Sequence, residues 1–162
     1  MARADFEVIT GEEFQRVATA LREVDSRLPG QLRSELRKAA RPLVARAKAK
    51  VRALPTHGRS HTGLRRRVAA GVGIRVSTSR HPGVTITTKM ADPSEAVIPR
   101  GMDSQRGWRH PVFGDTDNWV TQHTGGSWFR ETFADGRDEV QASVRQVLEN
   151  AAQTIADAGG RM

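Results

Sequence analysis

The sequence predicts an α+β fold in which N-terminal helices and a C-terminal helix accompany a small antiparallel sheet with a β-hairpin. Apolar residues recur every three or four positions near both ends, which is typical of helices with one buried face. In the middle, apolar and polar residues alternate, which indicates strands. The 162 residues suit a single α+β domain, 1–162. We expect a basic helical segment over 10–54, a sheet with loops over 64–130, and a C-terminal helix over 134–158 packed on the sheet.

Two helices are expected near the N-terminus. Thr10 and Glu13 fit a capping box, in which each side chain satisfies a backbone donor of the first turn. The apolar face of the first helix follows as Phe14, Val17, Leu21, Val24 and Leu28. After the interruption at 29–30, a second helix is expected from Gln31 to Leu54, with a kink at Pro42 because proline has no N–H to donate. Its apolar series is Leu32, Leu36, Leu43, Ala47, Val51 and Leu54.

The central segment predicts strands and loops. Residues 55–63 read as a polar loop, and alternation in 68–77 and 84–89 predicts a β-hairpin closed by the turn residues between them. Residues 96–98 predict a short third strand, 99–107 an exposed loop and 108–113 another strand. The C-terminal helix begins among acidic residues and ends at the glycines 159–160, with its apolar face given by Val140, Val144, Val147, Leu148, Ala151, Ile155 and Ala158.

The positive charge is concentrated in one segment. The chain has a formal net charge of +8, and residues 27–67 hold 13 of its 26 basic residues but only one acid, Glu35. This asymmetry indicates a polyanion or an acidic protein surface as partner, and a solvated helix face is the alternative. The candidate contact residues for DNA or an acidic partner are Arg33, Arg37, Arg41, Lys48, Arg52, Arg65, Arg66 and Arg67.

The sequence offers no support for an enzyme. Cysteine is absent, which excludes disulfides, thiolate metal sites and a cysteine nucleophile. No membrane-length apolar stretch, signal peptide, phosphate-binding loop or dinucleotide motif occurs. His57 and His61 are four apart in a segment that glycine and proline keep from being helical. We therefore expect no catalytic residue, cofactor, metal site or small-molecule substrate.

The aromatic residues gather in one stretch. Residues 108–133 hold all three tryptophans and three of the five phenylalanines. We expect Phe113, Trp119 and Phe129 in the core and Trp108 partly exposed. The candidates for a protein interface are Trp108, His110 and Trp128.

The chain resembles a known family on three motifs taken in order. These are His61-Thr62-Gly63-Leu64-Arg65-Arg66, the segment Gly107-Trp108-Arg109-His110-Pro111-Val112-Phe113-Gly114, and the continuation from Trp119 to Trp128-Phe129 before the last helix. It resembles the small neck, tail-completion or minor tail proteins of long-tailed bacteriophages and prophages, over roughly residues 10–158. It departs from them in an arginine-rich insertion at 99–106 and in its basic second helix.

The resemblance implies a structural virion protein of the head–tail junction that acts in tail assembly and joining. It implies a ring of identical subunits, with a hexamer as the working expectation, that contacts connector and tail-tube proteins and the genomic DNA in its lumen. It places the protein in the virion, and in the host cytoplasm during assembly. Two alternatives stay open: a free basic nucleic-acid-binding protein, and a small metal-dependent nuclease using His110, Asp115, Asp117 and His123.

Overall fold

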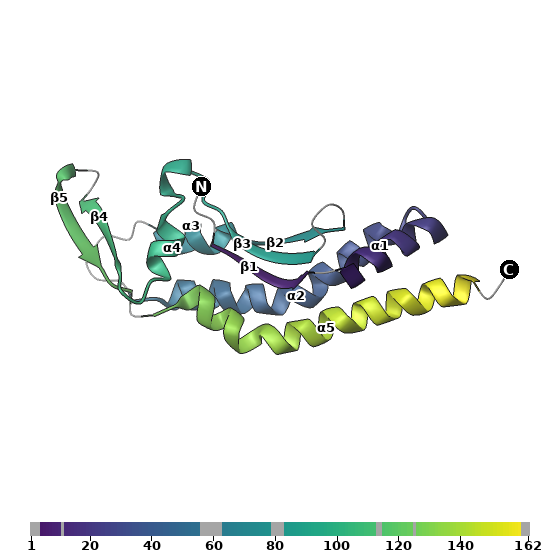
Figure 1. The fold of residues 1–162 in the computed structure, drawn as a ribbon. Coiled ribbons are helices and arrows are strands. Elements are labelled where there is room, and N and C mark those ends of the chain that lie inside the picture. Colours follow the sequence, from purple (N-terminus) through teal and green to yellow (C-terminus); the bar gives the residue numbers. More distant parts are fainter. Residues whose placement is uncertain are drawn as a thin grey trace. The chain divides into compact units, whose positions relative to one another are not determined.

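The protein is an α+β fold of N-terminal helices, two small antiparallel sheets and a long C-terminal helix, as expected from the sequence (Figure 1). The computed structural model describes residues 4–10, 12–55, 63–78, 83–112, 115–124 and 126–159. The chain divides into two compact units, which are described separately. Unit 1 comprises Met1–Ala4, Ala45–Gly73 and Thr87–Asp135, and unit 2 comprises Asp5–Val44, Ile74–Ile86 and Gly136–Met162.

Unit 2 contains the helix α1 (Glu12–Val24) and the N-terminal part of α2 (Leu28–Ala53). The expected apolar faces are buried in both helices, for example at Phe14 and Leu36. Asp25 separates the helices, because its carboxylate accepts from the Arg27 N–H at 2.7 Å and its carbonyl accepts from the Leu28 N–H at 3.1 Å. The second helix therefore begins three residues earlier than predicted, and it continues through Pro42.

The larger sheet has three strands in the order β1-β3-β2, comprising β1 (Ala4–Thr10), β2 (Val72–Ser77) and β3 (Gly83–Thr88). The predicted hairpin is confirmed, although its turn, 79–82, lies outside the described residues. The first strand was not expected. Its signal was present, since Phe6 and Val8 alternate with charged residues.

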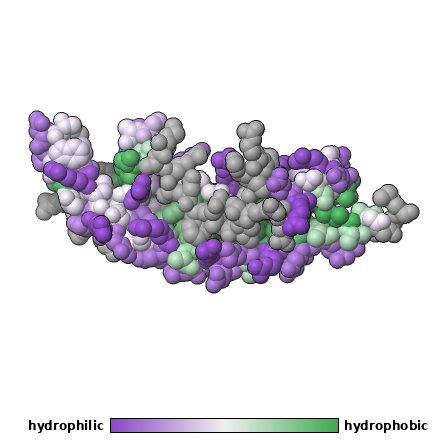
Figure 2. All heavy atoms as spheres, viewed as in Figure 1, coloured by the Kyte–Doolittle hydropathy of each residue, from purple (hydrophilic) through white to green (hydrophobic). Residues whose placement is uncertain are grey.

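The helix α5 (Trp128–Gly159) is longer than predicted, because it starts six residues before 134. Its buried face includes Val140, Val144 and Leu148. This helix packs against α2 and α1 (Figure 1), so the expectation that it lies on the sheet is corrected. The lower edge of the molecule in this view is mostly hydrophilic, and hydrophobic residues gather toward its right-hand end (Figure 2).

In unit 1, the structure differs from the prediction at two of the expected strands. The residues 68–71 are helical, within α3 (Leu64–Gly71), because Val68 and Ala69 are both buried on a short helix and do not alternate. After the 3-10 turn η1 (Pro93–Glu95), residues 96–97 form a turn, and Ile98 begins α4 (Ile98–Met102). The predicted loop over 99–107 is therefore partly helical, and Pro99, Met102 and Asp103 are buried.

The second sheet is a two-stranded antiparallel ribbon of β4 (Trp108–Val112) and β5 (Asp115–Gln122). The strand at Trp108 was expected, whereas β5 was not. The ribbon extends away from α3 and α4 of the same unit (Figure 1). Phe113 and Gly114, which connect its strands, lie outside the described residues.

Candidate interaction surfaces

Three of the eight predicted contact cations serve the fold. Arg33 donates from Nη1 to the Thr78 hydroxyl at 3.1 Å, and Arg65 donates to the Leu54 carbonyl. Arg67 forms an ion pair with Glu95, with 2.6 Å between Nη2 and Oε1. The Arg65 bond ties the start of α3 to the end of α2. These three side chains are therefore less available to a partner than the sequence implied.

The other five predicted cations are Arg37, Arg41, Lys48, Arg52 and Arg66, and none has an acidic partner in the described part of the chain. All are exposed except Lys48, which is half-buried. Two other lysines of α2 do have acidic partners. Lys38 pairs with Glu35 at 2.6 Å, and Lys50 lies 3.8 Å from both Glu131 and Asp135.

We call Lys48, Arg52 and Arg66 the cation corner of unit 1. Lys48 and Arg52 are four residues apart, so they lie on one side of α2. Arg66 lies on α3, which the Arg65 bond holds beside the end of α2. None of these three side chains pairs with an acidic residue in the described part of the chain.

The ribbon presents two different faces. Opposite pairs share a face, and the register pairs Arg109 with Thr121 and Pro111 with Trp119. The register shifts between Pro111 and Val112, and Val112 pairs with Asp115, so strand alternation does not extend the first face from Trp119 to Asp115 and Asp117. The second face carries the pairs Trp108–Gln122 and His110–Val120.

The second face of the ribbon is anchored. The rings of Trp108 and His110 stack with centroids 5.6 Å apart, and His110 Nε2 lies 3.0 Å from Gln122 Oε1. Trp108 also packs on Gly101, where an added Cβ would lie 2.6 Å from its Cγ. Trp108 and His110 are half-buried. The partial exposure expected for Trp108 is confirmed.

The first face of the ribbon is open. Every residue of β5 is exposed, and the exposed fraction of Trp119 is 44%. The Arg109 guanidinium lies 5.6 Å from the centre of the Trp119 ring, within range of a cation–π contact. Asp115 and Asp117 have no cationic partner among the described residues. The core position expected for Trp119 was therefore wrong.

A buried carboxylate fixes the base of the ribbon. Asp103 Oδ1 accepts the Phe129 N–H at 2.6 Å and the Arg130 N–H at 3.3 Å, while Oδ2 accepts from Arg130 Nε at 3.1 Å. It thereby caps the start of α5 from a distant position in the chain. Burial raises the pKa of Asp103, and the hydrogen bonds from Phe129 and Arg130 oppose that rise. We call these contacts the Asp103 clamp.

Two further hydrogen bonds join the same two chain segments. Thr124 Oγ1 donates to the Met102 carbonyl at 2.7 Å, and Ser127 Oγ donates to the Asp103 carbonyl at 3.0 Å. These hydrogen bonds therefore hold the two ends of the ribbon segment together at one point. Sequence reasoning missed Asp103, because a cap normally directly precedes its helix and this one is 25 positions from Trp128.

Trp128 lies in the aromatic core of unit 1. Its exposed fraction is 2%, and its ring meets Phe129 edge-on with centroids 5.3 Å apart. Phe129 in turn contacts Phe133 at 4.4 Å. The core position expected for Phe129 is confirmed. Trp128, which was expected at an interface, has almost no surface to offer a partner.

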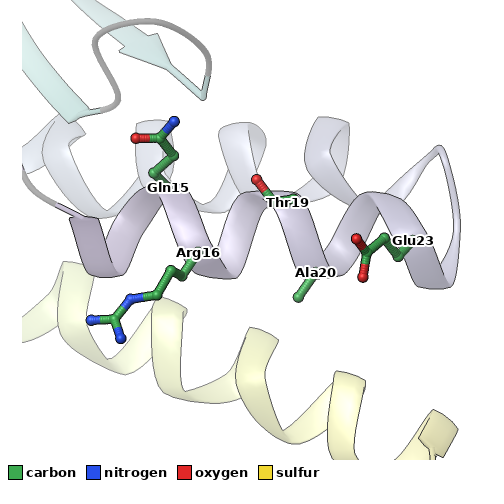
Figure 3. A pocket seen from close by; sticks show the side chains of 5 residues that line it. All are labelled: Gln15, Arg16, Thr19, Ala20 and Glu23. Carbon is green, nitrogen blue, oxygen red and sulfur yellow. The ribbon is translucent and has the colours of Figure 1, made fainter.

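The described residues contain no group of three His, Asp or Glu side chains arranged to hold a metal ion. His110 contacts Gln122, Asp115 Oδ1 accepts the Asp117 N–H at 3.0 Å, and His57 and His61 lie outside the described residues. A pocket of 560 Å³ lies on α1, lined by Gln15, Arg16, Thr19, Ala20 and Glu23 (Figure 3). Arg16 points toward α5 and Gln15 away from it, so the polar groups do not converge on one point as a ligand site requires.

No helix in the described part of the chain is both long and apolar enough to cross a membrane. Comparison with protein-family models, curated proteins and solved structures finds no match.

Proposed function

We propose that this chain is a structural virion protein of the phage head–tail junction, as a connector, tail-completion or minor tail component. It acts in tail assembly and joining, forms a ring with itself, and contacts the neighbouring connector and tail-tube proteins. It has no enzymatic role. It resides in the virion and, during assembly, in the host cytoplasm.

The observation that carries this proposal is the clamped ribbon. An assembly subunit needs a surface that is open in the single chain and covered in the particle. The first face of β4–β5 is such a surface, since every residue of β5 is exposed while buried hydrogen bonds fix the base of the ribbon. The ordered motifs that resemble neck and tail proteins include this ribbon and the start of α5.

The unpaired cations also fit this role. Arg37, Arg41, Lys48, Arg52 and Arg66 are available for phosphates of DNA that passes through a ring or for acidic neighbouring subunits. Contacts of this kind position a polyanion without reading its sequence. They require no base-specific groups, and no zinc or helix-turn-helix module is expected from the sequence.

Quantitative mass spectrometry of particles purified from the source strain tests the proposal. We expect the protein to copurify with particles at a few copies each, far below the tail-tube subunit. Its presence in the lysate together with its absence from washed particles would contradict the proposal. The tube subunit, measured in the same sample, controls for particle recovery.

A free nucleic-acid-binding protein is the second candidate, and it is favoured by the five cations that have no acidic partner among the described residues. Such a protein binds duplex DNA alone, and five phosphate contacts predict a slope of about −4 to −5 for log K against log salt. Replacing one cation by alanine then lowers the slope by about 1. A slope near zero excludes this candidate.

A further inference from the structure

We infer that the exposed side of α2 binds the phosphate backbone of a nucleic-acid duplex through two pairs of cations. One pair is Arg37 and Arg41 in unit 2, and the other is Lys48 and Arg52 in unit 1. The proposed function leaves these cations open to DNA or to acidic neighbouring subunits, so the inference goes beyond it. It does not depend on a place in the virion, and each pair is considered by itself.

The composition of α2 is the first observation. From Leu36 to Ala53 the helix has seven cations, and every other residue is apolar. This stretch contains no acid, hydroxyl, amide or imidazole group, so its side chains donate hydrogen bonds and accept none. The two pairs have no acidic partner in the described part of the chain. Such a surface suits phosphate oxygens, which accept hydrogen bonds and carry negative charge.

The members of each pair are close enough to bind phosphates of the same strand. They are four residues apart, so they lie on one side of the helix and about 6 Å apart along its axis. Phosphates follow one another every 3.4 Å or so along the axis of a duplex strand, so a pair spans about two phosphate steps. Two like charges at this spacing also repel each other on the free helix, and a bound phosphate offsets that repulsion.

An acidic protein surface fits this side of α2 less well than a phosphate backbone does. The centres of protein interfaces are built on large aromatic or apolar anchors, and lysine and alanine are depleted there. The large apolar residues Leu36, Leu43 and Val51 are each 0% exposed, so they cannot serve as anchors. The exposed apolar residues of this stretch are small ones, Pro42, Ala45, Ala49 and Ala53. They leave room for a backbone to approach the helix but offer no anchor to a protein.

The same features disfavour a membrane surface and a single strand. A helix that lies on a membrane inserts a free apolar face into the lipid, whereas the apolar face of α2 belongs to the core. Proteins that hold single strands without reading their sequence stack the bases on aromatic rings, and α2 contains no aromatic residue. A duplex presents its phosphates outward and requires neither feature.

Fluorescence anisotropy of a short labelled DNA duplex, titrated with the full-length protein at several salt concentrations, tests the inference. We expect the two pairs to account for about −3.6 of the slope of log K against log salt, at about −0.9 for each phosphate. R37A/R41A and K48A/R52A should each reduce the slope by about 1.8 and weaken binding by at least about tenfold. Alanine favours the helix at these positions, and circular dichroism confirms that each variant is folded.

R137A/R145A is the matched control, because it removes two exposed arginines from α5 and thus the same net charge. The control should leave the slope nearly unchanged. An equal effect of the control would mean that net charge alone acts, and it would overturn the inference. A wild-type slope near zero, a single strand of the same length bound as tightly as the duplex, or polyglutamate bound more tightly than DNA would overturn it as well.

An RNA duplex of the same sequence distinguishes the two sources of duplex phosphate. Binding of either duplex that depends on both cation pairs supports the inference, and the duplex bound more tightly names the source. Binding of both duplexes that neither pair affects overturns it.

These outcomes are separate from those of the proposed function. Duplex binding that depends on both pairs, by a protein that is absent from purified particles, supports the inference and contradicts the virion role. Protein in particles, with a slope that neither pair affects, contradicts the inference alone.

Discussion

Replacing Asp103 by alanine is expected to loosen the base of the ribbon and the first turn of α5 together. The carboxylate accepts two backbone N–H groups, from Phe129 at 2.6 Å and from Arg130 at 3.3 Å, as well as the Arg130 Nε. Its side chain is only 7% exposed, so water cannot readily replace these bonds. The substitution therefore leaves the Phe129 N–H buried and without an acceptor.

The cost follows from these contacts. Loss of a helix cap lowers the free energy of unfolding by about 1 kcal/mol, and a buried donor without a partner adds about 1–2 kcal/mol. The Arg130 ion pair adds little, about 0–1 kcal/mol, because the arginine side chain is mostly exposed. We expect a total loss of about 2–3 kcal/mol, or a fall in Tm of about 5–10 °C.

Urea unfolding followed by circular dichroism measures this loss. D103N is the matched variant, because its amide oxygen still accepts both N–H groups, and it is expected to cost about 1 kcal/mol or less. R130A removes the ion pair together with the hydrogen bond from Arg130 Nη2 to the Asp103 carbonyl, and it leaves the capping carboxylate in place. Hydrogen exchange of residues 104–124 provides a local readout, which should accelerate in D103A. Equal costs for D103A and D103N, or a change below about 0.5 kcal/mol in D103A, would refute the clamp.

Three further predictions concern the same unit. Burial raises the folded-state pKa of Asp103 above 3.8. The contribution of Asp103 to stability is therefore full below pH 3.8 and declines as the pH rises through the folded-state pKa. Urea titrations should show that D103N lowers the free energy of unfolding more at acidic than at neutral pH. In G71A, the new Cβ would lie 1.9 Å from the Lys89 carbonyl oxygen, and thermal unfolding should show that the free energy of unfolding falls by about 3 kcal/mol. G73A is the control, because no atom lies within 4 Å of its new Cβ. An equal loss in G73A would argue against the clash. W119F should lower acrylamide quenching of the fluorescence, because Trp119 is 44% exposed whereas Trp108 is half-buried and Trp128 is 2% exposed; unchanged quenching would place Trp119 in the core.

The helices were predictable because their apolar residues recur with the helical period. Phe14 and Leu21 in α1, and Val140 and Val144 in α5, are buried as expected. The ends of the helices were less predictable. The first turn of α5, which begins at Trp128, is capped by the Asp103 carboxylate, an acceptor that is distant in sequence. Contacts of that kind leave no local pattern.

The strands were predictable only where one face is buried. Val84 and Ile86 alternate with polar residues, and they are buried in β3. The sequence of β5 shows no such alternation, because both of its faces meet solvent. For the same reason Trp119 was expected in the core: a tryptophan in a chain poor in aromatics suggests burial, whereas the structure exposes it.

The candidate surface was foreseen in part. Charge segregation identified the cations, and five of the eight lack an acidic partner in the described residues. Composition could not separate these from Arg33, Arg65 and Arg67, whose partners lie elsewhere in the chain. Trp108 and His110 do lie on the ribbon, whereas Asp115 and Asp117 of β5 were considered only as metal ligands.

The hydrogen bonds from Thr124 and Ser127 have a consequence for how this chain can vary. They bring the two ends of the ribbon segment together independently of the residues between them. The entropy of closing a loop grows only with the logarithm of its length, so a longer or shorter insert at this point changes stability little. The tip of the ribbon, beyond the His110–Val120 pair, can therefore change in length while the anchored pairs at its base and the aromatic core around Trp128 stay intact.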